Sequence, residues 1–167
     1  LRRKGIYNER GGFVMDAIII KKEEIFRSIK LEMENEITSY MKILSKLMDK
    51  YEEELRKIHG SYRLYNSQKY NQFSNQIEEN IKYMISVREK YIKKLKNIVI
   101  IEQLKLMKYY QGITKEAGAR DSEIKEMITV IINEINRYKD EKMREILKNF
   151  YVYVVRITEL FYAKFKN

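Results

Sequence analysis

Residues 124–161 read IKEMITVIINEINRYKDEKMREILKNFYVYVVRITELF, and the architecture of the chain is organised around this stretch. Its apolar residues recur at spacings of three and four with one step of five, which is the period of one face of an α-helix. At about 1.5 Å per residue the helix would span roughly 57 Å, so it requires partners of similar length. The apolar positions are Ile124, Ile128, Ile131, Ile135, Tyr138, Met143, Ile146, Phe150, Val154, Ile157 and Phe161.

Two other segments repeat this period. The first begins at Asp16, and its apolar stripe continues through Gly60 to Tyr65, so we expect a helix over about 16–65. A helix that ends at a Gly60 C-cap is the alternative. The second stripe runs from Phe73 to Tyr109 and includes Ile98 and Ile101, so we expect a helix over about 71–111.

Composition agrees with a helical protein. The chain of 167 residues has no Pro, six Gly and 35% charged residues, whereas a sheet protein would need more turn residues. We predict an all-α fold of three long antiparallel helices (about 16–65, 71–111 and 119–165) in an elongated coiled-coil bundle, because short connections make consecutive helices antiparallel neighbours. The bundle forms a single domain over 13–167.

The first twelve residues differ from the rest. They read LRRKGIYNERGG, with a local charge of +3 and three glycines. We expect a solvated basic linker or lead-in segment over 1–12, and a basic segment that lies on a membrane is the alternative.

Catalytic and metal-binding motifs are missing from the sequence. It has no Cys and one His, and it contains no Gly-rich phosphate loop, paired histidines or nucleophile elbow. We therefore expect no enzymatic activity, cofactor, metal site or small-molecule substrate. The longest apolar run has six residues, whereas a membrane-spanning helix needs roughly 20, so we expect no such helix. A thiol-free chain without a signal peptide indicates a cytoplasmic location.

Positive charge is concentrated in one part of the chain. The net charge is +10, and 82–125 holds eleven basic residues against five acidic ones. Acidic partners at i+3 and i+4 are lacking between Lys90 and Lys96. The natural partner of this segment is an anionic membrane, with nucleic acid as the competitor. The residues expected to bind the membrane are Lys90, Lys93, Lys94, Lys96, Lys105, Lys108 and Arg120.

Apolar residues also exceed what one core stripe needs. Ile98 to Ile101 are contiguous, so their helix presents apolar surface on more than one side. We expect a helix wedged between two neighbours there, and a lipid-inserting element is the alternative. The run FYVYVV at 150–155 is apolar all round.

Sequence motifs suggest a family. The final stretch contains a Glu-x-x-Arg-aromatic-x-x-Glu-Lys run formed by Glu134, Arg137, Tyr138, Glu141 and Lys142, followed by Ile146, Phe150 and Tyr153. It resembles the last helix of the BAR domain of the sorting-nexin (PX-BAR) family. IKYMISVREKYIKKLKN at 81–97 and YEEELRKIHGSYRL at 51–64 are similar to the second helix of that family and to the end of its first.

The resemblance implies a nonenzymatic membrane-curvature module in endosomal sorting. Two chains, identical or different, would pair into a six-helix crescent whose basic face lies peripherally on endosomal membrane. The second chain would cover Phe150, Tyr151, Val152, Tyr153, Val154 and Val155. The phox-homology domain of that family is not expected in this chain, because its Pro-rich loop cannot be built without Pro. A structural coiled-coil scaffold is the alternative function, and nucleic-acid binding is a third.

Overall fold

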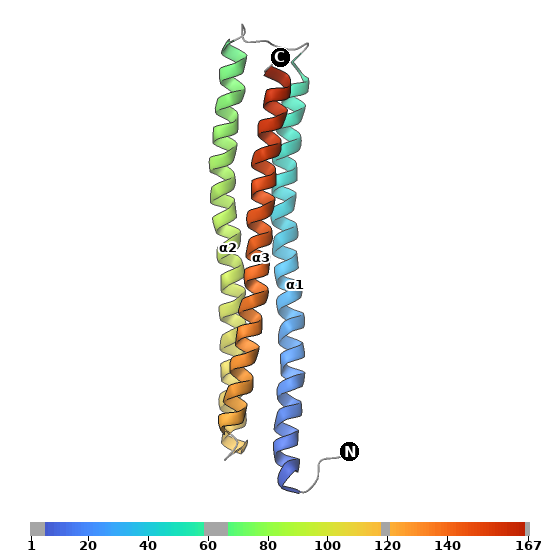
Figure 1. Cartoon of the computed structure of the whole chain (residues 1–167), viewed down its shortest axis with the longest axis vertical. Coiled ribbons are helices and arrows are strands. Elements are labelled where there is room, and N and C mark those ends of the chain that lie inside the picture. Colours follow the sequence, from blue (N-terminus) through green and yellow to red (C-terminus); the bar gives the residue numbers. More distant parts are fainter. Residues whose placement is uncertain (1–5, 59–66, 118–120, 166–167) are drawn as a thin grey trace. The chain divides into compact units, whose positions relative to one another are not determined.

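The computed structural model describes residues 6–58, 67–117 and 121–165, and the side chains of 16–58, 68–113 and 122–165. It contains three long helices, α1 (Ile6–Arg56), α2 (Ser67–Ala117) and α3 (Asp121–Phe165), of 51, 51 and 45 residues (Figure 1). No strand occurs among the described residues. The predicted all-α fold with three long helices is confirmed.

Helix ends differ from the sequence expectation. α1 already begins at Ile6, inside the predicted basic linker, because a glycine in a helix costs only about 1 kcal/mol and does not stop it. α1 ends at Arg56 and not near 65. There Lys57 N donates to Glu53 O at 3.3 Å, whereas Ile58 N donates to Leu55 O at 3.1 Å, an i→i−3 bond that tightens the last turn. His59 and Gly60 lie outside the described residues.

Contacts divide the chain into two compact units, each containing a segment of every helix. Unit 1 comprises Leu1–Glu34 and Leu95–Lys142, and unit 2 comprises Asn35–Lys94 and Met143–Asn167. A helix of about 50 residues rises roughly 75 Å, so side chains at its two ends share no neighbours.

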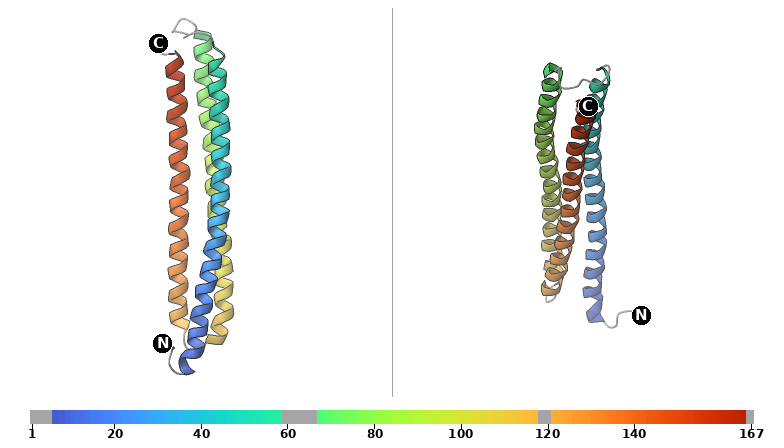
Figure 2. Two further views of the ribbon diagram at one scale, coloured as in Figure 1. Left: turned by 90° about the vertical axis from the view of Figure 1, so that its right-hand side faces the viewer. Right: turned by 45° about the horizontal axis from the view of Figure 1, so that its top comes forward.

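Consecutive helices are antiparallel within each unit. In unit 2, partner numbers on α2 fall as those on α1 rise, since Glu36 pairs with Lys94, whereas Glu54 pairs with Gln76. In unit 1, α1 and α3 run in the same direction, because Lys22 pairs with Glu134 and, two to three turns later, Glu34 pairs with Lys142. Figures 1 and 2 show the corresponding up-down-up order of the chain.

Unit 1 has an aliphatic core. Its buried side chains come from one stripe of each helix, at spacings of three, four and seven. The apolar members are Ile18, Ile25, Ile29, Met33, Leu95, Val99, Leu106, Ile124, Ile128, Ile131 and Ile135.

Among its described residues, the core of unit 2 contains seven buried aromatic side chains beside its aliphatic ones. Phe73 of α2 packs against Tyr51 of α1 and Phe165 of α3, with ring centroids 5.9 and 5.7 Å apart. Tyr40 packs on Tyr91 at 5.6 Å. Edge and tilted contacts of this kind contribute about 0.5–1.5 kcal/mol beyond area burial, so the aromatic rings hold all three helices of this unit together.

Three positions of the predicted stripes are wrong by one residue. On α2 the buried stripe passes through Val99 and Glu102 in place of Ile98, which is half-buried, and Ile101, which is 52% exposed. On α3 it passes through Tyr153 in place of Val154. At each site two neighbouring residues satisfy a three-or-four spacing almost equally, so the period alone cannot choose between them.

Buried tyrosines make unit 2 sensitive to alkali. Burial raises the pKa values of Tyr40 and Tyr153 to about 12, and it raises that of Tyr51, whose hydroxyl donates to Phe73 O at 3.3 Å. The folded state therefore favours the neutral phenol. The resulting stabilisation is complete below pH 10, the unfolded pKa, and is lost as the pH rises through 12.

We predict that the free energy of unfolding, measured by urea denaturation, falls between pH 9 and pH 11 by roughly 1 kcal/mol for each of these three tyrosines. The triple variant Tyr40→Phe/Tyr51→Phe/Tyr153→Phe should lose most of this slope, whatever its stability at pH 8. Tyr83→Phe, at an exposed position, is the control. An unchanged slope in the triple variant would show that these hydroxyls are not the titrating groups.

Candidate functional site

An exposed face of α2 in unit 1 combines aliphatic and basic side chains. Ile100, Leu104 and Met107 follow one another at spacings of four and three, which places them on one side of the helix. Leu104 at its centre is 64% exposed, and Ile100 is 52% exposed. We call this surface the lysine-aliphatic face, and its members are Lys96, Ile100, Ile101, Leu104, Lys105, Met107 and Lys108, all exposed.

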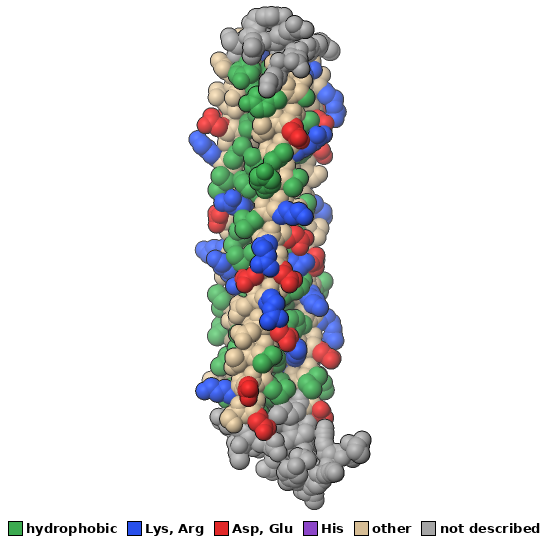
Figure 3. Space-filling model, in the orientation of Figure 1, with side chains coloured by type: hydrophobic (Ala, Val, Ile, Leu, Met, Phe, Trp, Pro, Cys, Tyr) green, Lys and Arg blue, Asp and Glu red, His purple; other side chains and the backbone are tan. Residues whose placement is uncertain are grey.

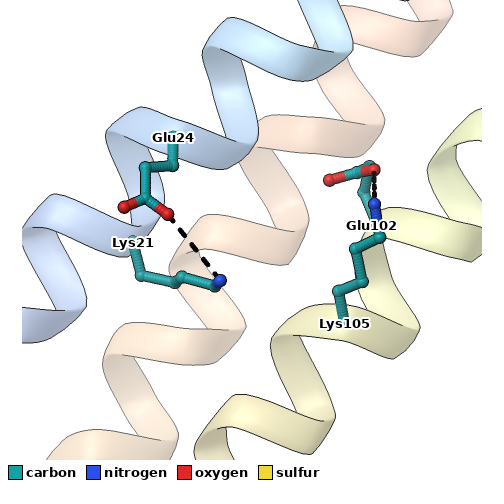
Figure 4. Close-up of polar contacts among 4 residues, drawn as sticks. All are labelled: Lys21, Glu24, Glu102 and Lys105. Carbon is teal, nitrogen blue, oxygen red and sulfur yellow. Dashed lines mark hydrogen bonds and ion pairs between the residues drawn. The ribbon is translucent and has the colours of Figure 1, made fainter.

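This face contains no carboxylate. Glu102 is the one acidic residue between Leu95 and Gln111, and it lies on the opposite, core side of α2, where it is 2% exposed. Lys105 Nζ donates a hydrogen bond to Glu102 Oε2 at 3.0 Å, and the two side chains form an ion pair (Figure 4). The hydrogen bond from Lys105 to Glu102, the charge of Glu102 and, more weakly, that of Glu32 raise the pKa of Lys105, so its ammonium stays protonated.

The lysines expected to bind a membrane are not equivalent. Lys94 is engaged within unit 2, where it pairs with Glu36 at 3.5 Å and lies 4.6 Å from the ring of Tyr91. Lys90 and Lys93 are exposed on unit 2, and Arg120 lies outside the described residues. In unit 1, Lys96 and Lys108 are exposed and form no ion pair with any described residue.

Ile98 to Ile101 do not lie between two neighbours as expected. Val99 is buried and Ile98 is half-buried, but Ile100 and Ile101 are each 52% exposed. The wedged-helix prediction is therefore wrong for the two residues that point away from the core. Predicting the lysine-aliphatic face would have required recognising Ile100, Leu104 and Met107 as a second stripe beside the core stripe.

The run from Phe150 to Val155 is only partly exposed. Tyr153 lies in the core of unit 2, and Phe150 is half-buried with the Arg88 guanidinium 4.7 Å from its ring. Tyr151, Val152 and Val155 are exposed, and Val154 is half-buried. Tyr153 is occupied by the core of its own unit, and contact of this run with a second chain stays a prediction.

The residues of the Glu-x-x-Arg-aromatic-x-x-Glu-Lys run on α3 face α1 within unit 1. Glu134 pairs with Lys22 at 3.0 Å. Lys142 pairs with Glu34 and lies over the ring of Tyr138, 5.4 Å from its centroid. Arg137 and Glu141 line an open hollow of about 400 Å³ with Lys22 and α1 residues Glu23, Phe26 and Lys30. The motif therefore contributes to the packing of α1 on α3 and to a surface groove.

In the described segments no group of three or more His, Cys, Asp or Glu residues is arranged to hold a metal ion. None of the helical residues that the structure describes forms an apolar stretch of sufficient length to span a bilayer.

The chain matches no protein-family model, and comparison with curated proteins and with solved structures found no significant match.

Removing one partner of the Glu102–Lys105 pair should destabilise unit 1. We predict that Lys105→Met lowers the urea midpoint because it leaves a buried carboxylate without its ion pair. The double variant Glu102→Leu/Lys105→Met should return the midpoint to the wild-type value or above it, since a leucine fits the aliphatic core. Lys108→Met is the matched control on the same face. Equal effects of Lys105→Met and Lys108→Met would contradict this account.

Proposed function

We propose that the chain is a helical module that binds anionic membrane surfaces peripherally through the lysine-aliphatic face of α2. The observation that supports this proposal is a row of exposed aliphatic side chains flanked by lysines and free of carboxylates. Helices that lie in the membrane interface have this composition, because the apolar side chains enter the headgroup and acyl boundary while the ammonium groups meet the lipid charge.

The aliphatic residues favour a membrane over nucleic acid. A phosphate backbone would satisfy the lysines but would leave Ile100, Leu104 and Met107 in water, since it offers no apolar phase. A lipid surface accommodates both groups. Complete burial of such a side chain stabilises by about 1.5–3 kcal/mol, and each lysine near an anionic surface adds about 1 kcal/mol.

The lysines should differ in their contributions. Lys96 and Lys108 have no ion partner among the described residues, so their charges are available to lipid. Part of the charge of Lys105 is balanced by Glu102. We therefore expect Lys96 and Lys108 to provide most of the salt-sensitive binding energy.

Membrane curvature and endosomal trafficking are the finer parts of this proposal. They come from the resemblance to sorting-nexin BAR domains, whereas the choice of the lysine-aliphatic face comes from its own side chains. Binding to flat anionic vesicles is therefore the first property to test, and dependence on vesicle diameter is the second.

We predict that the protein co-sediments with phosphatidylserine vesicles at 100 mM salt and not with phosphatidylcholine vesicles. Lys96→Glu/Lys108→Glu should weaken the partition coefficient at least thirtyfold, because loss of two lysines removes about 2 kcal/mol. Leu104→Ser should weaken binding and leave its salt dependence unchanged, since Leu104 contributes through burial.

Lys46→Glu/Lys50→Glu is the matched control, because it changes the net charge equally at two exposed positions of α1 in unit 2. Similar losses in both double variants would show that net charge, and not this face, determines binding. Absence of binding by the wild type would exclude the proposed function.

A further inference from the structure

A second surface of unit 1 is also apolar but has the opposite charge. It is a groove between α1 and α3 formed by two hollows of about 400 and 430 Å³ that both include Lys22. Its apolar residues include Ile19 and Val130, which are 46% and 50% exposed, and Met127. We call it the α1/α3 groove. Figure 3 shows one face of the molecule, on which hydrophobic side chains lie at the surface among charged ones.

The α1/α3 groove is acidic in a basic protein. Its lining includes three basic residues, Lys22, Lys30 and Arg137, against five acidic ones, Glu23, Glu123, Glu126, Glu134 and Glu141. Because the whole chain has a net charge of +10, this local excess of carboxylates is unusual for its surface. Lys22 is itself neutralised by Glu134 at 3.0 Å.

We propose that the α1/α3 groove binds the lysine-aliphatic face of a second copy of this chain. The two surfaces match in three respects: both have aliphatic centres, their charges are opposite, and their lengths fit. The face extends over 96–108, about 18 Å of helix, and the groove extends over 123–141 on α3, about 27 Å. A helix laid between α1 and α3 would complete a four-helix arrangement.

Charge selects this occupant over other contacts between copies. A groove placed against a second groove would oppose two carboxylate-rich rims, and two lysine-aliphatic faces would oppose ammonium groups. Groove against face is the pairing that joins opposite charges. The exposed apolar residues of α3 in unit 2, such as Tyr151, lie beside exposed Lys148 and Arg156, so a Tyr151 variant tests this surface as the competing contact.

Self-association would regulate membrane binding. The lysine-aliphatic face cannot contact lipid and a second copy at the same time, so the two states compete. This consequence rests on the proposed function, whereas the contact between copies does not. Anionic vesicles should therefore dissociate the associated form.

Charge-swapped variants test the contact without lipid. We would measure molecular mass by sedimentation equilibrium in 50 mM salt for the groove variant Glu23→Lys/Glu126→Lys and the face variant Lys96→Glu/Lys108→Glu. The wild type should exceed its monomer mass of 20.4 kDa. Each variant alone should associate at least tenfold more weakly. Their equimolar mixture should associate again, because each contact between unlike copies joins opposite charges.

Circular dichroism of both variants should show the wild-type helix content, and Lys46→Glu/Lys50→Glu is the charge-matched control. A monomeric wild type overturns the inference, as does a mixture that remains monomeric. Association abolished by Tyr151→Asp, with the groove and face variants unaffected, would assign the contact to α3 of unit 2 and also overturn it. Vesicle binding is measured separately, so a failure here does not decide the proposed function.

Discussion

Burial of one apolar stripe on each helix is the constraint on which the rest of the structure depends. Each stripe follows the helical period, mostly in steps of three, four, seven or eleven residues, and the segments of each unit are held together by these side chains. Once the stripe is fixed, the remaining sides of each helix must face solvent or another molecule. On both surfaces of unit 1 proposed to bind, the exposed apolar residues, such as Leu104 and Val130, lie beside the stripe and not in it, which is why they are exposed and still aliphatic.

Sequence periodicity predicted the fold because the period repeats over many turns and single errors average out. The helix class, the number of helices and most core positions followed from it. Periodicity failed where two neighbouring residues could each occupy a core position. Ile101 and Glu102 both fit the α2 period, and hydrophobicity favours Ile101, although Glu102 is the buried residue. Glu102 is buried because Lys105 neutralises it from the next turn, which a pattern of apolar residues cannot reveal. The early end of α1 at Arg56 was equally invisible to the apolar stripe.

The sequence shows where basic residues are concentrated, but it does not show which of them form ion pairs. The concentration of basic residues in the second helix was evident from the sequence, and Lys96 and Lys108 are indeed exposed. The engagement of Lys94 by Glu36 depends on which residues of α1 and α2 face each other, and spacing along one helix contains no such information. The α1/α3 groove combines residues more than 90 positions apart, so it required the structure.

In the proposed function the lysine-aliphatic face enters the membrane interface. Because the chain has no Cys, a single cysteine labelled with an environment-sensitive fluorophore reports on one position at a time. The account predicts that a label at Leu104→Cys is quenched by brominated lipids in phosphatidylserine vesicles, while a label at Lys46→Cys, on unit 2, is not. Equal quenching at both positions, or quenching at 46 alone, would contradict it.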